Sequence, residues 1–299
     1  MPPPLHTVET PSLLIAYHDS GPADGPVSIL LHGFPYDPRA YDTVAEFLAA
    51  QGLRVLVPYL RGYGATRFRD AATLRSGQQA ALGHDLRDFM DALAVPQATL
   101  AGYDWGGRAA CVVAALWPER ARGLVTGDGY NIFDHAAMAQ PVAPAHEHRL
   151  WYQFYFHSPR GEIALRERRA ELCRYIWEIW SPAWRFDDAT FAASAPSFDN
   201  PDFAEVVRHS YRHRFGYVPG DPAFDATEAL LARQPEIVVP TVALFGANDG
   251  LNAPGEVDPL QSSTQFTGRY RTGLLPGIGH NIPQEAPEAF ARAVLEVTA

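Results

Sequence analysis

One aspartate stands where a sharp turn would expose it for chemistry. The stretch Gly102-Tyr103-Asp104-Trp105-Gly106-Gly107 follows an aliphatic run and leads into a helical stretch that begins at Arg108. This strand–turn–helix order, with aspartate where the G-x-S-x-G motif has serine, is typical of a nucleophile elbow. The flanking glycines permit the tight turn, and the amide groups of the following helix point towards the reactive residue. We therefore predict that Asp104 is a nucleophile. The alternative is a simple helix cap, since aspartate is a favoured N-cap residue.

A carboxylate nucleophile restricts the substrates that the protein can use. An aspartate side chain in solution has a pKa of about 3.9, so it is ionised at neutral pH and needs no base to activate it. Attack on a carboxylic ester would give an anhydride, which is an unproductive exchange. Attack on an epoxide or an alkyl halide gives an ordinary ester, which water can cleave. Asp104 therefore argues against an esterase or a lipase.

Three further features follow the order expected for such a site. His32-Gly33-Phe34-Pro35 comes after a strand, and the backbone N–H of Phe34 can supply half of an oxyanion hole. Asp249 lies just past a late strand, and His280 lies in a loop before the final helix. Nucleophile, acid and histidine thus occur in the chain order that this kind of elbow requires.

The elements that must position these residues alternate between strand and helix. Short apolar runs alternating with amphipathic stretches predict an α/β fold with a mostly parallel sheet covered on both faces. We expect strands over Leu13–Tyr17, Val27–Leu31, Arg54–Pro58, Ala98–Tyr103, Arg122–Thr126, Thr241–Phe245 and Arg269–Leu275. We expect helices over Tyr41–Ala50, Leu74–Leu93, Gly106–Trp117 and Pro287–Val297.

The strand signal is missing from the middle of the chain. Residues 134–235 are rich in aromatic residues and arginine with helical spacing, and Asn200 before Pro201 predicts a helix N-cap. We expect a helical cap (lid) domain at 134–235, inserted into a core domain made of residues 1–133 and 236–299. An insertion at this point would cover the carboxyl ends of the strands, where open parallel sheets bind ligands.

With these residues in hand, the chain resembles the epoxide hydrolase and haloalkane dehalogenase branch of the α/β-hydrolase superfamily, and soluble epoxide hydrolases most closely. The resemblance extends from His32–Pro35 through Arg61-Gly62-Tyr63-Gly64 and Gly102–Gly107 to His280. It implies that Asp104 forms a covalent alkyl ester and that His280 activates water to hydrolyse that ester. The backbone N–H groups of Phe34 and Trp105 would then stabilise the oxyanion.

The resemblance also implies a proton donor for the leaving group. Epoxide hydrolases of this type use two lid tyrosines, and Trp151-Tyr152-Gln153-Phe154-Tyr155-Phe156 looks like the first tyrosine segment. Ser210-Tyr211-Arg212-His213 looks like the second. Tyr152 and Tyr211 would hydrogen-bond the epoxide oxygen and protonate the alkoxide. The alternative for each tyrosine is packing in an aromatic lid, and Tyr155 could take the place of Tyr152.

The acid partner of His280 has two candidates. Asp249 stands where most α/β-hydrolases place the acid. Asp128, in Thr126-Gly127-Asp128-Gly129-Tyr130, stands where some dehalogenases place it. We favour Asp249 and interpret Asp128 as a loop or substrate-facing residue, with Asp128 kept as the alternative acid.

Other reactions use the same nucleophile or the same fold. In a haloalkane dehalogenase the indole of Trp105 would hold the halide, but the asparagine that many dehalogenases place at position 34 is Phe34 here. A lid tryptophan (Trp151, Trp177, Trp180 or Trp184) could substitute. Fluoroacetate dehalogenases also resemble the chain, with Arg108 at one carboxylate clamp. Their second arginine would stand at Trp105, which argues against recognition of a small acid. A lyase or isomerase, or a small-molecule binding protein, remains a further alternative.

Composition and charge exclude several other classes. The 299 residues carry a net charge of −10, which argues against nucleic-acid binding, and no apolar run is long enough to span a bilayer. The N-terminus lacks signal-peptide features, and two cysteines make no disulfide framework. The histidines show no metal-ligand spacing. We expect a cytoplasmic enzyme that uses no cofactor or metal and acts on a small apolar substrate and water. A homodimer remains open.

Overall fold

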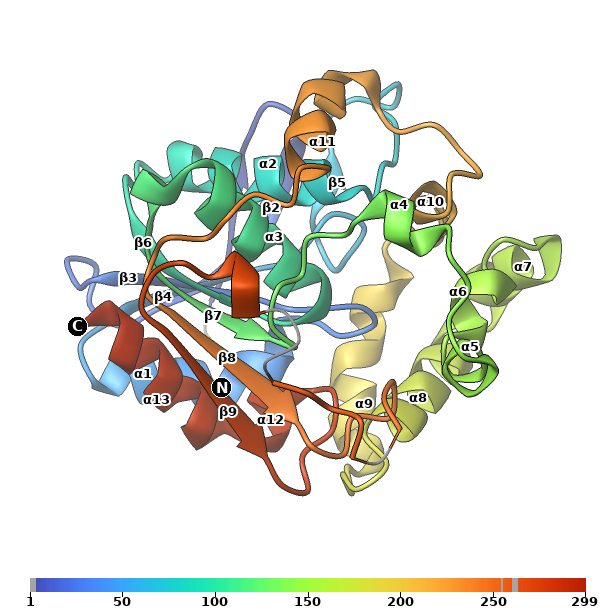
Figure 1. Cartoon of the computed structure of the whole chain (residues 1–299). Coiled ribbons are helices and arrows are strands. Elements are labelled where there is room, and N and C mark those ends of the chain that lie inside the picture. The colour runs from blue at the N-terminus through green and yellow to red at the C-terminus, as the bar shows by residue number, and fades with distance from the viewer. Residues whose placement is uncertain (1–3, 254, 260–262) are drawn as a thin grey trace.

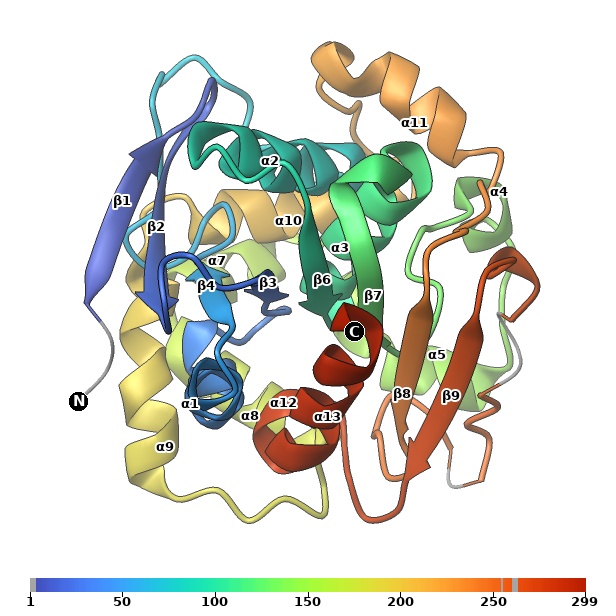
Figure 2. The same cartoon turned by 90° about the vertical axis from the view of Figure 1, so that its left-hand side faces the viewer.

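A mixed β-sheet lies at the centre of the structure (Figure 1). The structure is a computed structural model that describes residues 4–253, 255–259 and 263–299. The strands lie in the order β1-β2-β4-β3-β6-β7-β8-β9, which Figure 2 shows from left to right, and β5 pairs with β2. β2 pairs antiparallel with β1, β4 and β5, and the remaining strand pairs are parallel. The bounds are β1 (Leu5–Glu9), β2 (Leu13–Ser20), β3 (Val27–Leu31), β4 (Arg54–Pro58), β5 (Arg67–Phe68), β6 (Ala98–Gly102), β7 (Ala121–Gly127), β8 (Thr241–Gly246) and β9 (Tyr270–Leu275).

Helices cover both faces of this sheet. In both views α2 and α3 lie on one face, and α1, α12 and α13 lie on the other (Figures 1 and 2). Strands β6 and β8 are buried along their whole length, as expected for parallel strands that are covered on both sides. The bounds of these helices are α1 (Asp42–Ala50), α2 (Gln79–Ala92), α3 (Asp104–Leu116), α12 (Ile282–Glu285) and α13 (Pro287–Thr298).

Residues 134–235, here called the cap segment, contain helices and no β-strand. Much of the segment lies beside the sheet, on the side towards which β7 and β8 point (Figure 1). It comprises α4 (His135–Met138), α5 (Pro144–Arg149), α6 (Trp151–Tyr155), α7 (Pro159–Glu167), α8 (Arg169–Trp180), α9 (Asp188–Ser194), α10 (Phe203–Arg214) and α11 (Asp225–Leu231), with short 3₁₀ turns at Ala195–Asp199 and Pro222–Phe224. In the described part of the chain, no helix is long and apolar enough to cross a membrane.

The predicted strands all form, within two or three residues of the expected ends, and β1 and β5 are additional. The helix predicted over Leu74–Leu93 begins only at Gln79. The residues before it pack beneath α10 instead, where the Gly77 N–H donates to His209 Nδ1 at 3.1 Å.

The helix predicted to start at Pro201 after an Asn200 N-cap begins two residues later, since α10 starts at Phe203 with Asp202 as its N-cap residue. The Asn200 side chain still accepts from the Asp202 N–H at 2.8 Å, and its amide also donates to the carbonyl oxygens of Gly64 and Thr66, at 3.2 and 2.7 Å. Asn200 therefore ties the cap segment to the loop between β4 and β5.

Candidate active site

Asp104 is the first residue of α3 and lies at the tip of the sharp turn that follows β6. Its φ of +50° is in the left-handed region, which costs a non-glycine residue about 1–2 kcal/mol, so the surrounding packing must hold it there. A Cβ at Gly106 would lie 2.0 Å from the Leu31 carbonyl oxygen, and one at Gly33 would lie 2.6 Å from the Cβ of Asp104. The two glycines therefore let β3 and the loop after it approach the turn.

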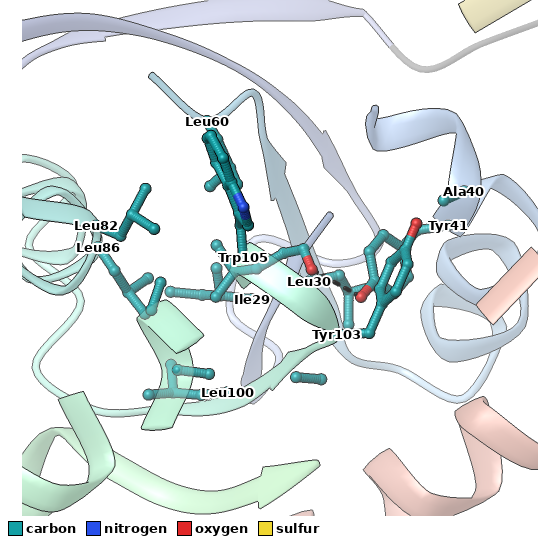
Figure 3. Close-up of a cluster of buried hydrophobic side chains, with 14 of the residues drawn as sticks. Ile29, Leu30, Ala40, Tyr41, Leu60, Leu82, Leu86, Leu100, Tyr103 and Trp105 are labelled. Carbon is teal, nitrogen blue, oxygen red and sulfur yellow. Dashed lines mark hydrogen bonds between the residues drawn. The ribbon is translucent and has the colours of Figure 1, made fainter. Parts of the chain in front are cut away.

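The aromatic residues on either side of Asp104 point to opposite sides of the turn. Figure 3 shows Tyr103 beside Tyr41, and Trp105 on the side of Leu60. Both aromatic side chains are fully buried, whereas the Asp104 side chain keeps 14% of its surface exposed. The turn thus buries its neighbours and leaves the carboxylate accessible.

The loop after β3 supplies a hydrogen-bond donor to this carboxylate. The Phe34 backbone N–H donates to Asp104 Oδ1 at 2.7 Å. The predicted oxyanion-hole donor is therefore already hydrogen-bonded to the candidate nucleophile. His32 holds the loop: its Nε2 accepts from the Leu60 N–H at 3.1 Å, and its Nδ1 lies 3.0 Å from the Gly33 carbonyl oxygen. Burial lowers the His32 pKa to about 4, so the ring stays neutral and Nε2 can accept the hydrogen bond from Leu60.

The second predicted donor, the backbone N–H of Trp105, makes no hydrogen bond to Asp104 among the hydrogen bonds of the described residues. It lies in the first turn of α3, where N–H groups have no intrahelical partner. The Trp105 half of the oxyanion hole stays a prediction.

His280 approaches Asp104 from the loop after β9. Its Nε2 lies 3.9 Å from Asp104 Oδ2, and its Nδ1 lies 2.7 Å from Asp249 Oδ2. The distance from Nδ1 to Asp128 Oδ2 is 3.7 Å, which is too long for a hydrogen bond. The Asp249 side chain is 2% exposed and that of Asp128 is 28% exposed. The geometry therefore joins His280 to Asp249, with Asp128 beside the pair.

The carboxylates around His280 change its pKa, and they also affect the pKa of Asp128. Burial opposes protonation of His280, but the carboxylate of Asp249, helped by Asp128 and Asp104, outweighs burial and raises the His280 pKa to about 10. Loss of hydration raises the pKa of Asp128 to about 7, and the negative charge of Asp249 adds to this effect. Three carboxylates thus surround one imidazole, and Asp128 holds a proton more readily than an aspartate in solution does.

The end of helix α8 holds the loops that carry Asp249 and His280. The Trp180 carbonyl oxygen accepts from the Gly250 N–H at 2.9 Å and from the His280 N–H at 3.2 Å. The Ser181 hydroxyl also accepts from the His280 N–H, at 3.1 Å. The Trp180 ring packs edge-on against the imidazole, with centroids 4.9 Å apart. Sequence reasoning missed this support, because nothing in the sequence places the end of α8 against two distant loops.

The two predicted tyrosines contact each other, and both feel the charge of Asp104. Tyr152 on α6 and Tyr211 on α10 have ring centroids 5.4 Å apart, and both are buried. The Gln153 side-chain amide donates to the Tyr152 hydroxyl at 3.0 Å. Burial raises the pKa of Tyr152 to about 12 and that of Tyr211 well above its usual value, and the negative charge of Asp104 contributes to both shifts. Both phenols are therefore neutral at physiological pH. Tyr155 is only partly buried.

The Phe34 ring joins the loop after β3 to the cap segment. Its centroid lies 5.6–6.5 Å from those of six aromatic rings, from Trp105, Tyr152, Phe156, Trp180, Phe203 and Tyr211. The indole N–H groups of Trp105 and Trp180 are buried and have no hydrogen-bond partner among the described residues. His280 Nε2 is likewise buried and without a partner there. Three polar atoms around this cluster are thus free for a substrate or water.

The carboxylates beside His280 could also hold a metal ion by distance alone. Ligand atoms of Asp128, Asp249 and His280 lie within 4.8 Å of one another. Nδ1 is the His280 nitrogen that faces Asp249. A metal bound at Nδ1 would replace the proton that Nδ1 shares with Asp249, so binding through this atom would break the Asp–His pair.

The chain matches the family model described as alpha/beta hydrolase fold over residues 26–287. It therefore belongs to the α/β-hydrolase family, which confirms the predicted fold. Its relatives include an epoxide hydrolase B of Mycobacterium tuberculosis, 31% identical over 94% of each chain, and a haloalkane dehalogenase of Mycobacterium marinum, 30% identical over 81% of this chain and 75% of that one. These relatives place the chain in the epoxide hydrolase and haloalkane dehalogenase branch of the family, as predicted.

A solved structure extends the similarity to the whole chain. A Klebsiella pneumoniae protein that is provisionally named an epoxide hydrolase is 46% identical, with a TM-score of 0.95 over 98% of this chain and 97% of that one. The match includes the cap segment as well as the sheet.

Proposed function

We propose that the protein is an epoxide hydrolase that converts an apolar epoxide to a vicinal diol through an ester on Asp104. The observation that carries the proposal is the pair of buried, neutral phenols of Tyr152 and Tyr211 beside the accessible Asp104 carboxylate. An epoxide oxygen leaves as an alkoxide and needs a proton, which a neutral phenol can donate. A halide needs no proton, so the phenol pair favours the epoxide.

In the first step Asp104 Oδ2 attacks an epoxide carbon and the carbon–oxygen bond of the ring breaks. Tyr152 or Tyr211 gives its proton to the departing oxygen, and water then reprotonates the phenolate. The product is an alkyl ester whose carbonyl oxygen is Oδ1, the atom to which the Phe34 N–H already donates. The donor is therefore arranged before the oxyanion of the second step forms.

In the second step His280 Nε2 takes a proton from water, and the hydroxide adds to the ester carbonyl carbon. The oxyanion on Oδ1 collapses and expels the diol as an alkoxide, which takes the proton back from His280. The regenerated carboxyl group of Asp104 then gives its proton to the hydroxide left when water reprotonated the phenolate, which restores the carboxylate. Formation of the ester removes the charge of Asp104, which is one of the charges that raise the His280 pKa. Alkylation thus shifts His280 towards its neutral form when a base is required.

Asp249 is the acid that we assign to His280, and the 2.7 Å contact supports this choice over Asp128. We further propose that residues 1–133 and 236–299 are the core domain and that the cap segment is a lid domain, which contributes the two phenols. The supporting contacts include the bond from Trp177 Nε1 to the Pro35 carbonyl oxygen, at 2.7 Å, which joins the lid to the oxyanion loop.

A single turnover in heavy-oxygen water tests the covalent route. Enzyme in excess over styrene oxide should place the label in the Asp104 carboxylate and leave the first diol unlabelled. Label found in the diol, or full activity of Asp104→Asn, would show that water attacks directly. A protein that binds the epoxide without forming diol would be a binding protein, and an unhydrated rearranged product would indicate an isomerase.

A haloalkane dehalogenase is the second candidate, and the unpartnered indole N–H groups of Trp105 and Trp180 favour it. Weak N–H donors of this kind suit a halide ion. Bromide release from 1-bromobutane, without diol formation from any epoxide, would support the dehalogenase over the epoxide hydrolase.

A further inference from the structure

The carboxylate of Glu285 is a partly buried acidic group that the proposed mechanism does not use. Glu285 is the last residue of the short helix α12, which follows the loop of His280. Its Oε2 accepts from the Gly279 N–H at 2.8 Å, and its Oε1 accepts from the Asn281 N–H at 3.1 Å. One carboxylate therefore holds the backbone on both sides of the histidine.

The hydroxyl of Ser181 completes this arrangement from the cap segment. It donates to Glu285 Oε1 at 2.6 Å and accepts from the His280 N–H at 3.1 Å. Ser181 and His280 are both buried, so water does not readily replace these bonds when one of them is lost. The backbone N–H groups of residues 279, 280 and 281 are thus all bonded to Glu285 or Ser181.

The backbone of the histidine loop is also packed closely between two other elements. A Cβ at Gly279 would lie 2.5 Å from the Ser181 Cα, just after the end of α8. A Cβ at Gly246 would lie 2.1 Å from the Gly279 carbonyl oxygen, at the end of β8. The loop therefore fills the space between the sheet and the cap segment, and a displacement of the end of α8 would displace the loop as well.

The three hydrogen bonds to Glu285 require both of its oxygens to be acceptors. Loss of hydration raises the pKa of Glu285, whereas the bonds from Ser181, Gly279 and Asn281 lower it. An ionised carboxylate accepts at both oxygens and makes stronger hydrogen bonds than a neutral amide does. Glutamine at this position would turn one oxygen into an NH₂ group, which cannot accept, so at least one of the three bonds would be lost.

A helix cap alone would explain only part of this geometry. The bond from the Asn281 N–H joins Glu285 to the N-cap residue of its own helix. The bonds from Gly279 and Ser181 lie outside α12, and the second of them crosses to the cap segment. The carboxylate therefore holds more of the histidine loop than capping requires.

We propose that Glu285 is a positioning residue for His280 and that Ser181 links this role to the cap segment. The two residues keep Nε2 where it can take a proton from water and keep Nδ1 against Asp249. The effect on ester hydrolysis rests on the proposed epoxide hydrolase function, whereas the hold on His280 does not. Formation of the ester does not use His280, so loss of positioning should slow one chemical step, and a general loss of structure should slow both.

Single-turnover kinetics of Glu285→Gln and Ser181→Ala test the effect on the chemistry. Ser181→Ala removes a single hydroxyl, so it tests the same bonds should Glu285→Gln fail to fold. Rapid quench with styrene oxide should show ester hydrolysis slowed about 10–100-fold in each variant, while ester formation changes less than about twofold. The double variant should be no slower than the slower single variant, because the two residues act on His280 through one connected set of bonds.

Glu288→Gln is the matched control. It makes the same chemical change in the neighbouring helix α13, at an exposed carboxylate that pairs with Arg292 at 2.9 Å, and both steps should keep their wild-type rates. Equal slowing of both steps in Glu285→Gln and Ser181→Ala would overturn the proposal, and so would wild-type ester hydrolysis in both. An effect of Glu285→Gln without one of Ser181→Ala would overturn the link to the cap segment.

Proton NMR of the resting protein separates this inference from the proposed function. The Nδ1 proton of His280, bonded to Asp249 at 2.7 Å, should give a resonance far downfield that is absent from His280→Gln. We expect it to exchange with water at least about tenfold faster in Glu285→Gln and Ser181→Ala than in wild type and Glu288→Gln. Unchanged exchange would overturn the hold on His280. Faster exchange in a protein that forms no ester would support that hold and overturn the epoxide hydrolase.

Discussion

The two halves of the candidate site are held in different ways. On the sheet side Asp104, Asp249 and His280 come from three loops, and short hydrogen bonds from Phe34, His280 and Leu251 hold the two carboxylates. On the cap side Tyr152 and Tyr211 are held mainly by ring packing, with the Gln153 amide on one of the two hydroxyls.

This difference follows from charge. A buried carboxylate or imidazolium is costly unless each of its polar atoms has a partner, so the charged half must be fixed by hydrogen bonds. A buried neutral phenol needs fewer hydrogen-bond partners than a buried charge does, and its raised pKa keeps it neutral. In the proposed mechanism the sheet side therefore supplies charges fixed by hydrogen bonds, and the cap side supplies protons from phenols whose position depends on packing.

The largest expected effect comes from a substitution that disrupts the charged groups on the sheet side of the site. Asp249→Asn keeps the shape of the acid but removes the charge that favours the imidazolium of His280. We expect ester hydrolysis to slow about 10³–10⁴-fold, as loss of the charge on an Asp–His pair typically does. Formation of the ester should change far less, so the covalent intermediate should accumulate. Rapid quench followed by mass measurement of the Asp104 peptide would detect it.

Asp128→Asn is the matched control, since it removes a second carboxylate from the same histidine. Its Oδ2 lies 1.0 Å farther from Nδ1 than that of Asp249 does, by the distances of 3.7 and 2.7 Å. We expect less than about a tenfold effect on ester hydrolysis, because no hydrogen bond is lost. A larger effect of Asp128→Asn than of Asp249→Asn would reverse the assignment of the acid.

The next largest effect comes from removing the phenol hydroxyls on the cap side of the site. Tyr152→Phe and Tyr211→Phe each remove one hydroxyl and keep the ring, and the double variant removes the whole proton donor. We expect the double variant to slow formation of the ester about 10²–10³-fold, within the usual range for general acid catalysis, and each single variant to slow it less. Stopped-flow measurement of the first step should show this loss, while hydrolysis of a preformed ester should be nearly unaffected.

Tyr155→Phe serves as the control for the tyrosine pair, because it makes the same chemical change on the same helix at a partly buried position. A loss in Tyr155→Phe as large as in Tyr152→Phe would mean that the wrong tyrosine has been assigned. If the double variant formed the ester at the wild-type rate, the leaving group would need no proton, which would favour a halide.

The sheet half could be predicted from the sequence because its signals are local. The glycines around Asp104, the loop that carries Phe34 and the apolar runs before Asp249 each lie within a few residues of the group that they position. The parallel order of the strands then brings their carboxyl ends together. The short distance from His280 to Asp249 depends on loop geometry, so the sequence alone left Asp128 open as the alternative.

The cap half could be predicted only in part, because its signals are not local. The segments of Tyr152 and Tyr211 were identified by resemblance, but their contact depends on how α6 packs against α10. Nothing in the sequence indicated that the end of α8 would support His280. Asn200 shows the same limit, since its bond from the Asp202 N–H is local but its bonds to the distant loop of Gly64 and Thr66 have no signal in the sequence.

The smallest expected effect concerns the contact that joins the two halves. Asp37, just after the loop of Phe34, is 1% exposed and accepts from the hydroxyls of Ser194 and Ser197 of the cap segment, at 2.7 and 2.6 Å. Burial raises the Asp37 pKa to about 6, although these hydrogen bonds oppose the shift. The folded protein therefore binds a proton at Asp37 more tightly than the unfolded chain does.

The stabilisation from this proton is complete below the unfolded pKa of about 4 and is lost as the pH rises through 6. The free energy of unfolding of wild-type protein, relative to that of Asp37→Asn, should therefore fall by about 2–3 kcal/mol between pH 4 and pH 7. Urea unfolding of both proteins across this range measures the difference. Asp70→Asn, at an exposed aspartate, should instead give a curve nearly parallel to wild type. Parallel curves for wild type and Asp37→Asn would mean that Asp37 stays ionised. The contact between sheet and cap would then be a buried charge fixed by hydrogen bonds, as on the sheet side of the site.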